Sequence, residues 1–218
     1  PAEFGDALRP IVESGEEAVI ITLAGKLSGT AQSAAIAAAE VGGNVWVVDS
    51  GNVTIGQNIL LRYAVRLRDQ GLTGHEIAEE LERVKSRICL LARVDTLEYL
   101  VRGGRLSKTA GFAGTLLNIK PVLCVEDGEI KVLGKARGSQ QSNNMLTEFI
   151  KKKGNVDFSM PVMLAYSGTD NALLKGYIEN SRALWAGHLD SLPITMIGST
   201  ISTHAGPGAI AVAFFAKG

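Results

Sequence analysis

Three segments combine polar functional groups with glycine, the residue that lets a ligand approach the backbone. The first is Gly25-Lys26-Leu27-Ser28-Gly29-Thr30, between an apolar run and an alanine-rich segment. A loop joining a strand to a helix in this way presents hydroxyls, backbone N–H groups and the helix dipole to one point. Ser28, Gly29 and Thr30 are therefore candidates for an anion site. The alternative is that Thr30 only caps the helix and Ser28 fills the turn.

Ser28 does not fit the pattern of a hydrolase nucleophile. That pattern, G-x-S-x-G, is out of phase here by one residue, because Gly25, Lys26 and Leu27 precede the serine and Gly29 follows it. The nearby sequence also offers no acid–base partner. The pattern favours binding over hydrolysis.

The second segment is DTLEYLVRGGRLSKTAG, residues 95–111. Arg105 follows two glycines, so the backbone can bend sharply and aim the guanidinium at an oxyanion. Leu97, Leu100 and Val101 supply an apolar face beside it. The alternative is an exposed arginine after a flexible turn. Arg137, at an expected strand end in KARG, is another cation that could reach a cleft.

The third segment is GSTISTHAGPGAIAV, residues 198–212, in which His204 lies between hydroxyl residues and a Gly-Pro-Gly bend. His204 has no carboxylate or cysteine at metal-ligand spacing, so we predict no metal site. The glycines around it permit close approach of a ligand. An ordinary polar role remains the alternative.

Composition argues against several classes of protein. The 22 basic and 22 acidic residues balance, and aromatic residues make up only 6%, so a nucleic-acid surface is not expected. Neither a phosphate loop nor G-x-G-x-x-G occurs, which disfavours nucleotide binding. Cys89 and Cys124 lie in apolar runs and are expected to be free thiols, consistent with a reducing compartment. The apolar stretches are too short to span a membrane. We therefore predict a cytoplasmic protein without stable membrane insertion.

The order of elements predicts an α/β fold with two domains. Apolar runs at 18–24 and 45–50 alternate with helical segments, which is typical of a parallel sheet. Two strands are too few to be stable alone, so we expect this sheet to be incomplete. After residue 88 the pattern changes to strands, helices and an Asp127–Gly128 hairpin. We therefore predict the remainder of a parallel-sheet α/β domain at 1–87 and an α+β domain with a mixed or antiparallel sheet at 88–218.

Taken together, these segments resemble the DegV family. The matching motifs occur in the order and at about the spacings of that family, namely LSGTAQSA, VVDS, DTLEYLVRGGRLSKTAG, LLNIKPVL, KARG and THAGPGA. Each motif is weak alone, but the combination is highly specific and covers nearly the whole chain. Family members also have an upstream T-S-Q-P-like turn and a first strand with a D-S motif. This chain starts at Pro1, just after that turn, so we expect the upstream segment to be missing.

The resemblance implies a two-domain bacterial protein with a long-chain fatty acid buried between its domains. It assigns the carboxylate to Ser28, Gly29, Thr30 and His204. It assigns Arg105 and Arg137 to the step in which a carrier presents the acyl group to an ATP-dependent kinase subunit for acyl-phosphate formation. On this interpretation the chain is not itself an enzyme, and it needs no cofactor. The alternative is a stand-alone acyl- or phosphoryl-transfer enzyme that uses Ser28 and His204.

Burial of an acyl tail requires an apolar wall, since each buried methylene contributes about 0.8 kcal/mol. The segment TAGFAGTLLNI, residues 109–119, is the candidate for a helix that forms this wall. Its wall residues would be Phe112, Leu116, Leu117 and Ile119. Each of them could instead belong to an ordinary domain core.

Overall fold

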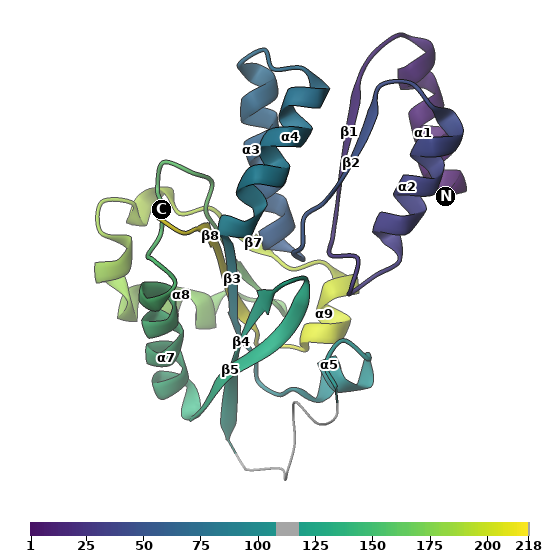
Figure 1. Cartoon of the computed structure of the whole chain (residues 1–218). Coiled ribbons are helices and arrows are strands. Elements are labelled where there is room, and N and C mark those ends of the chain that lie inside the picture. Colours follow the sequence, from purple (N-terminus) through teal and green to yellow (C-terminus); the bar gives the residue numbers. More distant parts are fainter. Residues whose placement is uncertain (108–117, 218) are drawn as a thin grey trace. The chain divides into compact units, whose positions relative to one another are not determined.

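The computed structural model describes residues 1–107 and 118–217 and divides into two compact units (Figure 1). Unit 1 comprises Pro1–Ile88 with Asp127–Glu129, and unit 2 comprises Cys89–Glu126 with Ile130–Gly218.

Unit 1 alternates helices with two short strands. Its elements are α1 (Ala2–Glu13), β1 (Ala18–Thr22), α2 (Thr30–Val41), β2 (Val45–Asp49), α3 (Ile55–Asp69), α4 (Gly74–Val84) and the 3-10 turn η1 (Lys85–Arg87). Strands β1 and β2 pair in parallel, from Ala18 opposite Val45 to Thr22 opposite Asp49. The expected parallel sheet is therefore present, with two strands among the described residues.

Helices cover both faces of this small sheet, which explains its continuous apolar strands. α1 and α2 lie on one side, and α3 and α4 on the other (Figure 1). Leu8 of α1 and Ala37 of α2 form a core cluster with Ala18 of β1. Trp46 of β2 packs edge-to-face on His75 of α4, with ring centroids 6.0 Å apart.

The start of α4 shows how local sequence fixes a helix end. The Thr73 hydroxyl accepts a hydrogen bond from the Glu76 amide, at 3.3 Å, and the Thr73 amide donates to the Glu76 carboxylate, at 2.8 Å. This reciprocal pair is a capping box, for which a threonine followed three residues later by a glutamate is the sequence signature. It holds the pKa of the Glu76 carboxyl below its usual value, chiefly because the Thr73 amide donates to the charged form.

Unit 2 is built around a larger sheet. Its elements are β3 (Ile88–Arg93), α5 (Glu98–Arg102), β4 (Ile119–Glu126), β5 (Glu129–Arg137), α7 (Gly138–Lys152), β6 (Met163–Tyr166), α8 (Ala172–Asn180), η2 (Arg182–Trp185), η3 (Leu189–Ser191), β7 (Ile194–Met196), α9 (Ser199–Ala205) and β8 (Ile210–Phe215). Over the described residues the strand order is β5-β4-β3-β8-β6-β7. β3 with β4 and β6 with β8 are antiparallel, whereas β6 with β7 is parallel. The mixed sheet confirms the predicted fold class.

The Asp127–Gly128 hairpin is also confirmed. Both residues have positive φ, 53° and 73°, and join β4 to β5. A two-residue turn with this pair of angles matches the twist of antiparallel strands, and Asp-Gly adopts it readily.

The two faces of the large sheet bury different clusters, because side chains alternate along a strand. Val122 and Cys124 of β4 face the main core, which α7 and α8 complete with Leu146 and Tyr177. Trp185 is fully buried there, and its indole N–H donates to the Ser181 hydroxyl at 2.9 Å. A second cluster contains Leu97, Leu100, Leu106, Leu123 and Ala209. The second cluster packs α5 against the sheet, beside two of the candidate motifs.

α9 forms in a segment rich in serine and threonine. β7 ends at Met196, and the helix begins at Ser199. Serine and threonine have modest helix propensity. Here the Ser202 hydroxyl donates to the Ile197 carbonyl and the Thr203 hydroxyl to the Ser199 carbonyl, both at 3.0 Å. These side-chain bonds help to hold a helix that propensity alone does not predict.

Candidate functional site

The SGT loop, residues 25–30, leaves the carboxyl end of β1 and leads directly into α2. Asp49 at the end of β2 fixes its first residue, since one carboxylate oxygen accepts from the Gly25 amide at 3.0 Å. The other oxygen accepts from the Gly51 amide at 2.8 Å. One side chain therefore orders the loops that follow both parallel strands, the place where α/β folds commonly bind ligands.

Ser28 and Thr30 lie together within this loop. Their hydroxyl oxygens are 2.8 Å apart, and the Thr30 amide donates to the Ser28 hydroxyl at 3.3 Å. Gly29 occupies the N-cap of α2, and Thr30 is the first helical residue. Thr30 is therefore not the N-cap residue of α2, contrary to the alternative. Gly29 holds that position and has no side chain to cap the helix. The first turn of α2 keeps backbone donors for another acceptor.

Gly29 leaves room beside the two hydroxyls. Apart from its chain neighbours Ser28 and Thr30, a Cβ built on this residue would meet no heavy atom of the described residues within 4 Å. Both hydroxyls are half-buried. The Cβ position of Gly29, between the two hydroxyl residues in the chain, is therefore open.

In unit 2, the segment with two glycines forms the C-terminal end of α5. Gly103 is the C-cap and Gly104 has a φ of 69°, so the chain turns back on the helix. The Arg105 amide then donates to the Leu100 carbonyl at 2.9 Å, as in many helix ends of this kind. The exposed Arg105 side chain donates to the Gly103 carbonyl at 2.7 Å. The predicted sharp bend is present, and it orients the guanidinium.

His204 lies in α9 and packs against the same turn. A Cβ on Gly103 would overlap Nδ1 of His204, so only glycine permits this approach. Nδ1 is buried and has no hydrogen-bond partner among the described residues. The structure thus brings together two motifs that are about a hundred residues apart in the sequence, those of Arg105 and His204.

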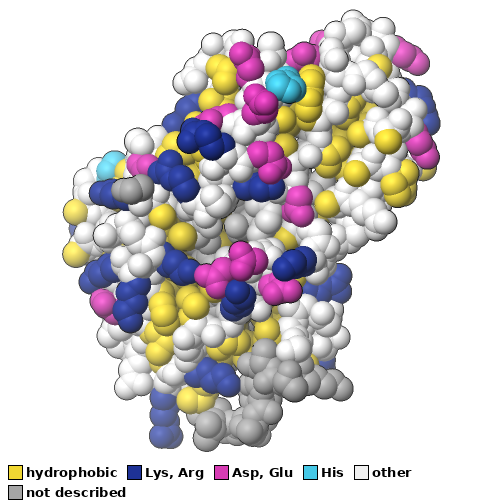
Figure 2. All heavy atoms as spheres, viewed as in Figure 1, with side chains coloured by type: hydrophobic (Ala, Val, Ile, Leu, Met, Phe, Trp, Pro, Cys, Tyr) yellow, Lys and Arg dark blue, Asp and Glu magenta, His cyan; other side chains and the backbone are white. Residues whose placement is uncertain are grey.

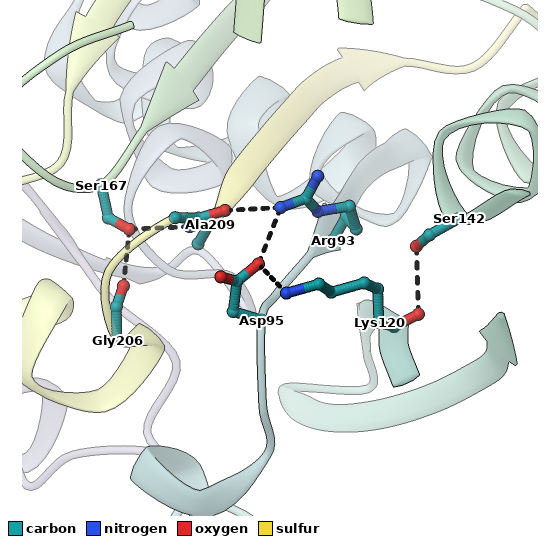
Figure 3. A network of polar contacts seen from close by, with 8 residues as sticks. Arg93, Asp95, Lys120, Ser142, Ser167, Gly206 and Ala209 are labelled. Carbon is teal, nitrogen blue, oxygen red and sulfur yellow. Dashed lines mark hydrogen bonds and ion pairs between the residues drawn. The ribbon is translucent and has the colours of Figure 1, made fainter. Parts of the chain in front are cut away.

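The Gly-Pro-Gly bend after His204 is equally close-packed. Gly206 has a φ of 73°, and a Cβ there would overlap the Tyr99 ring of α5. The buried Ser167 at the end of β6 donates to the Gly206 carbonyl and accepts from the Ala209 amide at 2.9 Å (Figure 3). Sequence reasoning missed Ser167, although a serine followed by glycine at the end of an apolar run is a weak signal for such a role.

A charged group lies beside this bend. Asp95 accepts from Arg93 at 2.8 Å and from Lys120 at 2.9 Å (Figure 3). Burial lowers the pKa of the Arg93 guanidinium, and the Asp95 charge opposes that shift. None of these three residues was identified from the sequence, because Arg93 occurs within a run that otherwise predicts an apolar strand.

The remaining candidate residues are more scattered. Arg137 is exposed at the end of β5, where it is the N-cap of α7. Ile119 is half-buried at the start of β4. Phe112, Leu116 and Leu117, the other residues predicted to line the acyl tail, lie outside the described residues. Ser28, Gly29 and Thr30 belong to unit 1, whereas the other candidates named here belong to unit 2.

The surface charges and the two cysteines are as the sequence predicts. Cationic and anionic side chains are intermingled on the face seen in Figure 2. Cys89 and Cys124 are free thiols, and burial raises the pKa of both, which makes them poor nucleophiles. Across residues 1–107 and 118–217 no three metal-ligating side chains gather, and no helix is long and apolar enough to cross a bilayer.

Comparison with known proteins identifies the family. A family model described as "Uncharacterised protein, DegV family" matches residues 1–217. The DegV domain-containing protein TTE1491 of Caldanaerobacter subterraneus is 34% identical over 225 residues, covering 100% of this chain and 77% of that protein.

Two solved structures of fatty-acid-binding proteins are similar to this chain in fold. A DegV family protein from Thermus thermophilus, described by its fatty acid binding, has a TM-score of 0.83 at 29% identity, over 99% of this chain and 76% of that one. A stearic acid-binding protein from Eubacterium ventriosum has a TM-score of 0.82 at 26% identity, over 97% and 74%. The chain belongs to the DegV family.

Proposed function

We propose that this chain binds a long-chain fatty acid. Its carboxylate would accept hydrogen bonds from the SGT loop of unit 1 and from His204 of unit 2. The observation that carries the proposal is the pair of hydroxyls on Ser28 and Thr30, 2.8 Å apart at the start of α2, next to the space that Gly29 leaves. The solved structures of fatty-acid-binding proteins that the chain resembles support the choice of ligand.

The proposed donors suit a carboxylate. A carboxylate removed from water must be compensated by hydrogen bonds or by an opposite charge. Ser28 and Thr30 now bond each other, and rotation of their hydroxyl hydrogens would let both donate to a ligand oxygen. The backbone N–H groups and the dipole of α2 add to the same attraction. Neutral donors and a helix end of this kind hold an acid without requiring a chemical step.

We favour a carrier over an enzyme that acts alone. The Ser28 hydroxyl bonds the hydroxyl and the amide of Thr30, and these are hydrogen-bonding groups of the kind that holds a carboxylate. Lipid binding by relatives in the family also fits a protein without catalytic activity of its own.

We further propose that the bound acid is presented to an ATP-dependent kinase subunit for acyl-phosphate formation. Arg105 and Arg137 would serve that step, because both are exposed cations that could meet phosphate oxygens. Arg105 is also oriented by its bond to the Gly103 carbonyl.

The test is extraction of lipid from the purified protein and mass spectrometry of the extract. Ser28→Ala should release fatty acid faster, because the carboxylate loses a donor that is worth roughly 1.5–3 kcal/mol, or about ten- to a hundredfold in affinity. Ser86→Ala, an exposed serine elsewhere in unit 1, is the matched control and should retain the ligand. If Ser28→Ala and Ser86→Ala retain fatty acid equally, the assignment of the carboxylate to the SGT loop is wrong.

A further inference from the structure

Arg93 is a charged residue at a position where the strand pattern calls for an apolar one. It is the last residue of β3, and its side chain is only 1% exposed. Leu91, two residues earlier on the same face of the strand, belongs to the main core of unit 2. Removal of a guanidinium from water is unfavourable unless its interactions in the protein compensate for it. Burial of Arg93 therefore needs a specific reason.

Only one nitrogen of this guanidinium has partners among the described residues. Nη2 donates to the Asp95 carboxylate at 2.8 Å and to the Gly208 carbonyl at 2.9 Å. Nε and Nη1 are buried without an acceptor there. As Figure 3 shows, the bonded nitrogen points toward the chain that enters β8 and toward Asp95. Arg93 thus links Asp95 to the segment that follows His204.

Asp95 is in turn held by a second cation. Lys120 of β4 donates to the same carboxylate oxygen at 2.9 Å, and its own carbonyl accepts from the buried Ser142 of α7 at 3.0 Å. The group therefore extends from α7 through β4 and Asp95 to Arg93 (Figure 3). Lys120 and Ser142 connect Asp95 to β4 and α7, and this restricts the position of the Arg93 guanidinium.

The segment after His204 is anchored at two carbonyls. Ser167 donates to the carbonyl of Gly206, and Arg93 donates to the carbonyl of Gly208. At the helix end the Gly206 amide donates to the Ser202 carbonyl at 2.8 Å, which joins this segment to α9. A shift at Gly208 would therefore be passed through Gly206 to the helix that holds His204.

Stability alone is a poor explanation for this arginine. Replacement of buried ionic groups by well-packed apolar side chains is often neutral or stabilising. Asp95 would still be paired with Lys120 after such a change, and its side chain is 40% exposed. An apolar residue at position 93 would thus satisfy the core and leave no isolated charge, but it would give up the anchor at Gly208.

We propose that Arg93, held by Asp95, is a positioning residue that fixes residues 206–209 and thereby places the His204 imidazole. Arg93, Asp95, His204 and residues 206–209 all belong to unit 2, so this part of the proposal does not depend on the proposed function. The consequence for ligand retention rests on the proposed function, in which His204 donates to the fatty-acid carboxylate.

The test compares Arg93→Met with Arg182→Met in the full chain. Arg182 is an exposed arginine paired with Glu179 at 2.8 Å, so its loss changes the charge equally without touching the bend. Arg93→Met should keep or raise the melting temperature. Amide hydrogen exchange at Gly208 and Ala209, which donate to Ser167, should become about tenfold faster, as expected for loss of a bond to a charged donor. The NMR signals of the His204 ring should shift, and fatty acid should be released about tenfold faster.

Arg93→Lys tests the same proposal if the methionine variant does not fold. Lysine keeps the charge but lacks the planar fork that bonds Asp95 and Gly208 together. It should give an intermediate increase in exchange at Gly208. Unchanged exchange and unchanged His204 ring signals in the folded variants would overturn the positioning role. A lower melting temperature in Arg93→Met with unaltered exchange would show a role in stability alone and would also overturn it. If the wild type binds no fatty acid, the proposed function fails, while the exchange and ring signals still decide on Arg93.

Discussion

Replacement of Gly103 by alanine would put a methyl group into the space that Nδ1 of His204 occupies. The added carbon would also lie 3.1 Å from the Tyr99 carbonyl, which is backbone and cannot move aside as a side chain can. The φ of Gly103 is −74°, so backbone strain is not the cause. The expected effect is overpacking between α5 and α9.

The magnitude follows from the cost of inserting a carbon into a packed contact, typically about 1–3 kcal/mol. For a chain of this length each kcal/mol lowers the melting temperature by roughly 2–4 °C. Gly103→Ala should therefore melt about 2–12 °C below the wild type. Because relief comes most easily by moving the imidazole, the NMR signals of the His204 ring should shift and fatty-acid retention should fall.

Gly176→Ala is the control with the opposite sign. Gly176 lies within α8, and a Cβ there would meet no described heavy atom within 4 Å. Alanine at such a position should stabilise the chain by about 0.5–1 kcal/mol through helix propensity. Equal melting temperatures for Gly103→Ala and the wild type, with unmoved His204 signals, would refute the close contact between the two motifs.

Two further predictions concern charged groups of unit 2. Arg105→Ala should leave lipid retention unchanged but impair phosphorylation of the bound acid by a kinase subunit, with Arg102→Ala, at the end of the preceding helix α5, as control. Equal loss of retention and phosphorylation would place Arg105 at the ligand instead. Glu126 accepts from Lys131 and Lys153, and these bonds lower the pKa of its carboxyl to about 2. A depressed pKa stabilises the fold above the unfolded value of 4.5, and this contribution is lost as the pH falls toward 2. In acid melting curves Glu126→Gln should lack that part of the pH dependence, and an identical pH dependence in both proteins would contradict the assignment.

Patterns among neighbouring residues were sufficient to predict much of the fold. The capping box of Thr73 and Glu76 and the Asp127–Gly128 turn depend on neighbouring residues, so their patterns are specific. Buried strands are recognisable because helices cover both of their faces. The mixed sheet of unit 2 follows from the combination of a hairpin with strand–helix alternation.

The contacts that shape the site were not predictable in the same way. Gly103 and Gly206 are required by the His204 and Tyr99 side chains, which approach from other parts of the chain. Arg93 bonds a carbonyl 115 residues away. No local sequence pattern predicts this bond between Arg93 and Gly208, since it depends on the pairing of β3 with β8 in the sheet. Ser28 could be nominated from its loop, but the space beside Gly29 is a property of the folded chain.

The two tryptophans of the chain give each unit its own optical reporter. Trp46 lies in unit 1 against His75, and Trp185 is fully buried in unit 2 beside Tyr177. An indole shielded from water emits at shorter wavelength than one in contact with solvent, so Trp185 should dominate the blue side of the emission spectrum. With Trp46→Phe and Trp185→Phe variants, fluorescence during denaturation would follow the melting of one unit at a time and measure how strongly the two transitions are coupled.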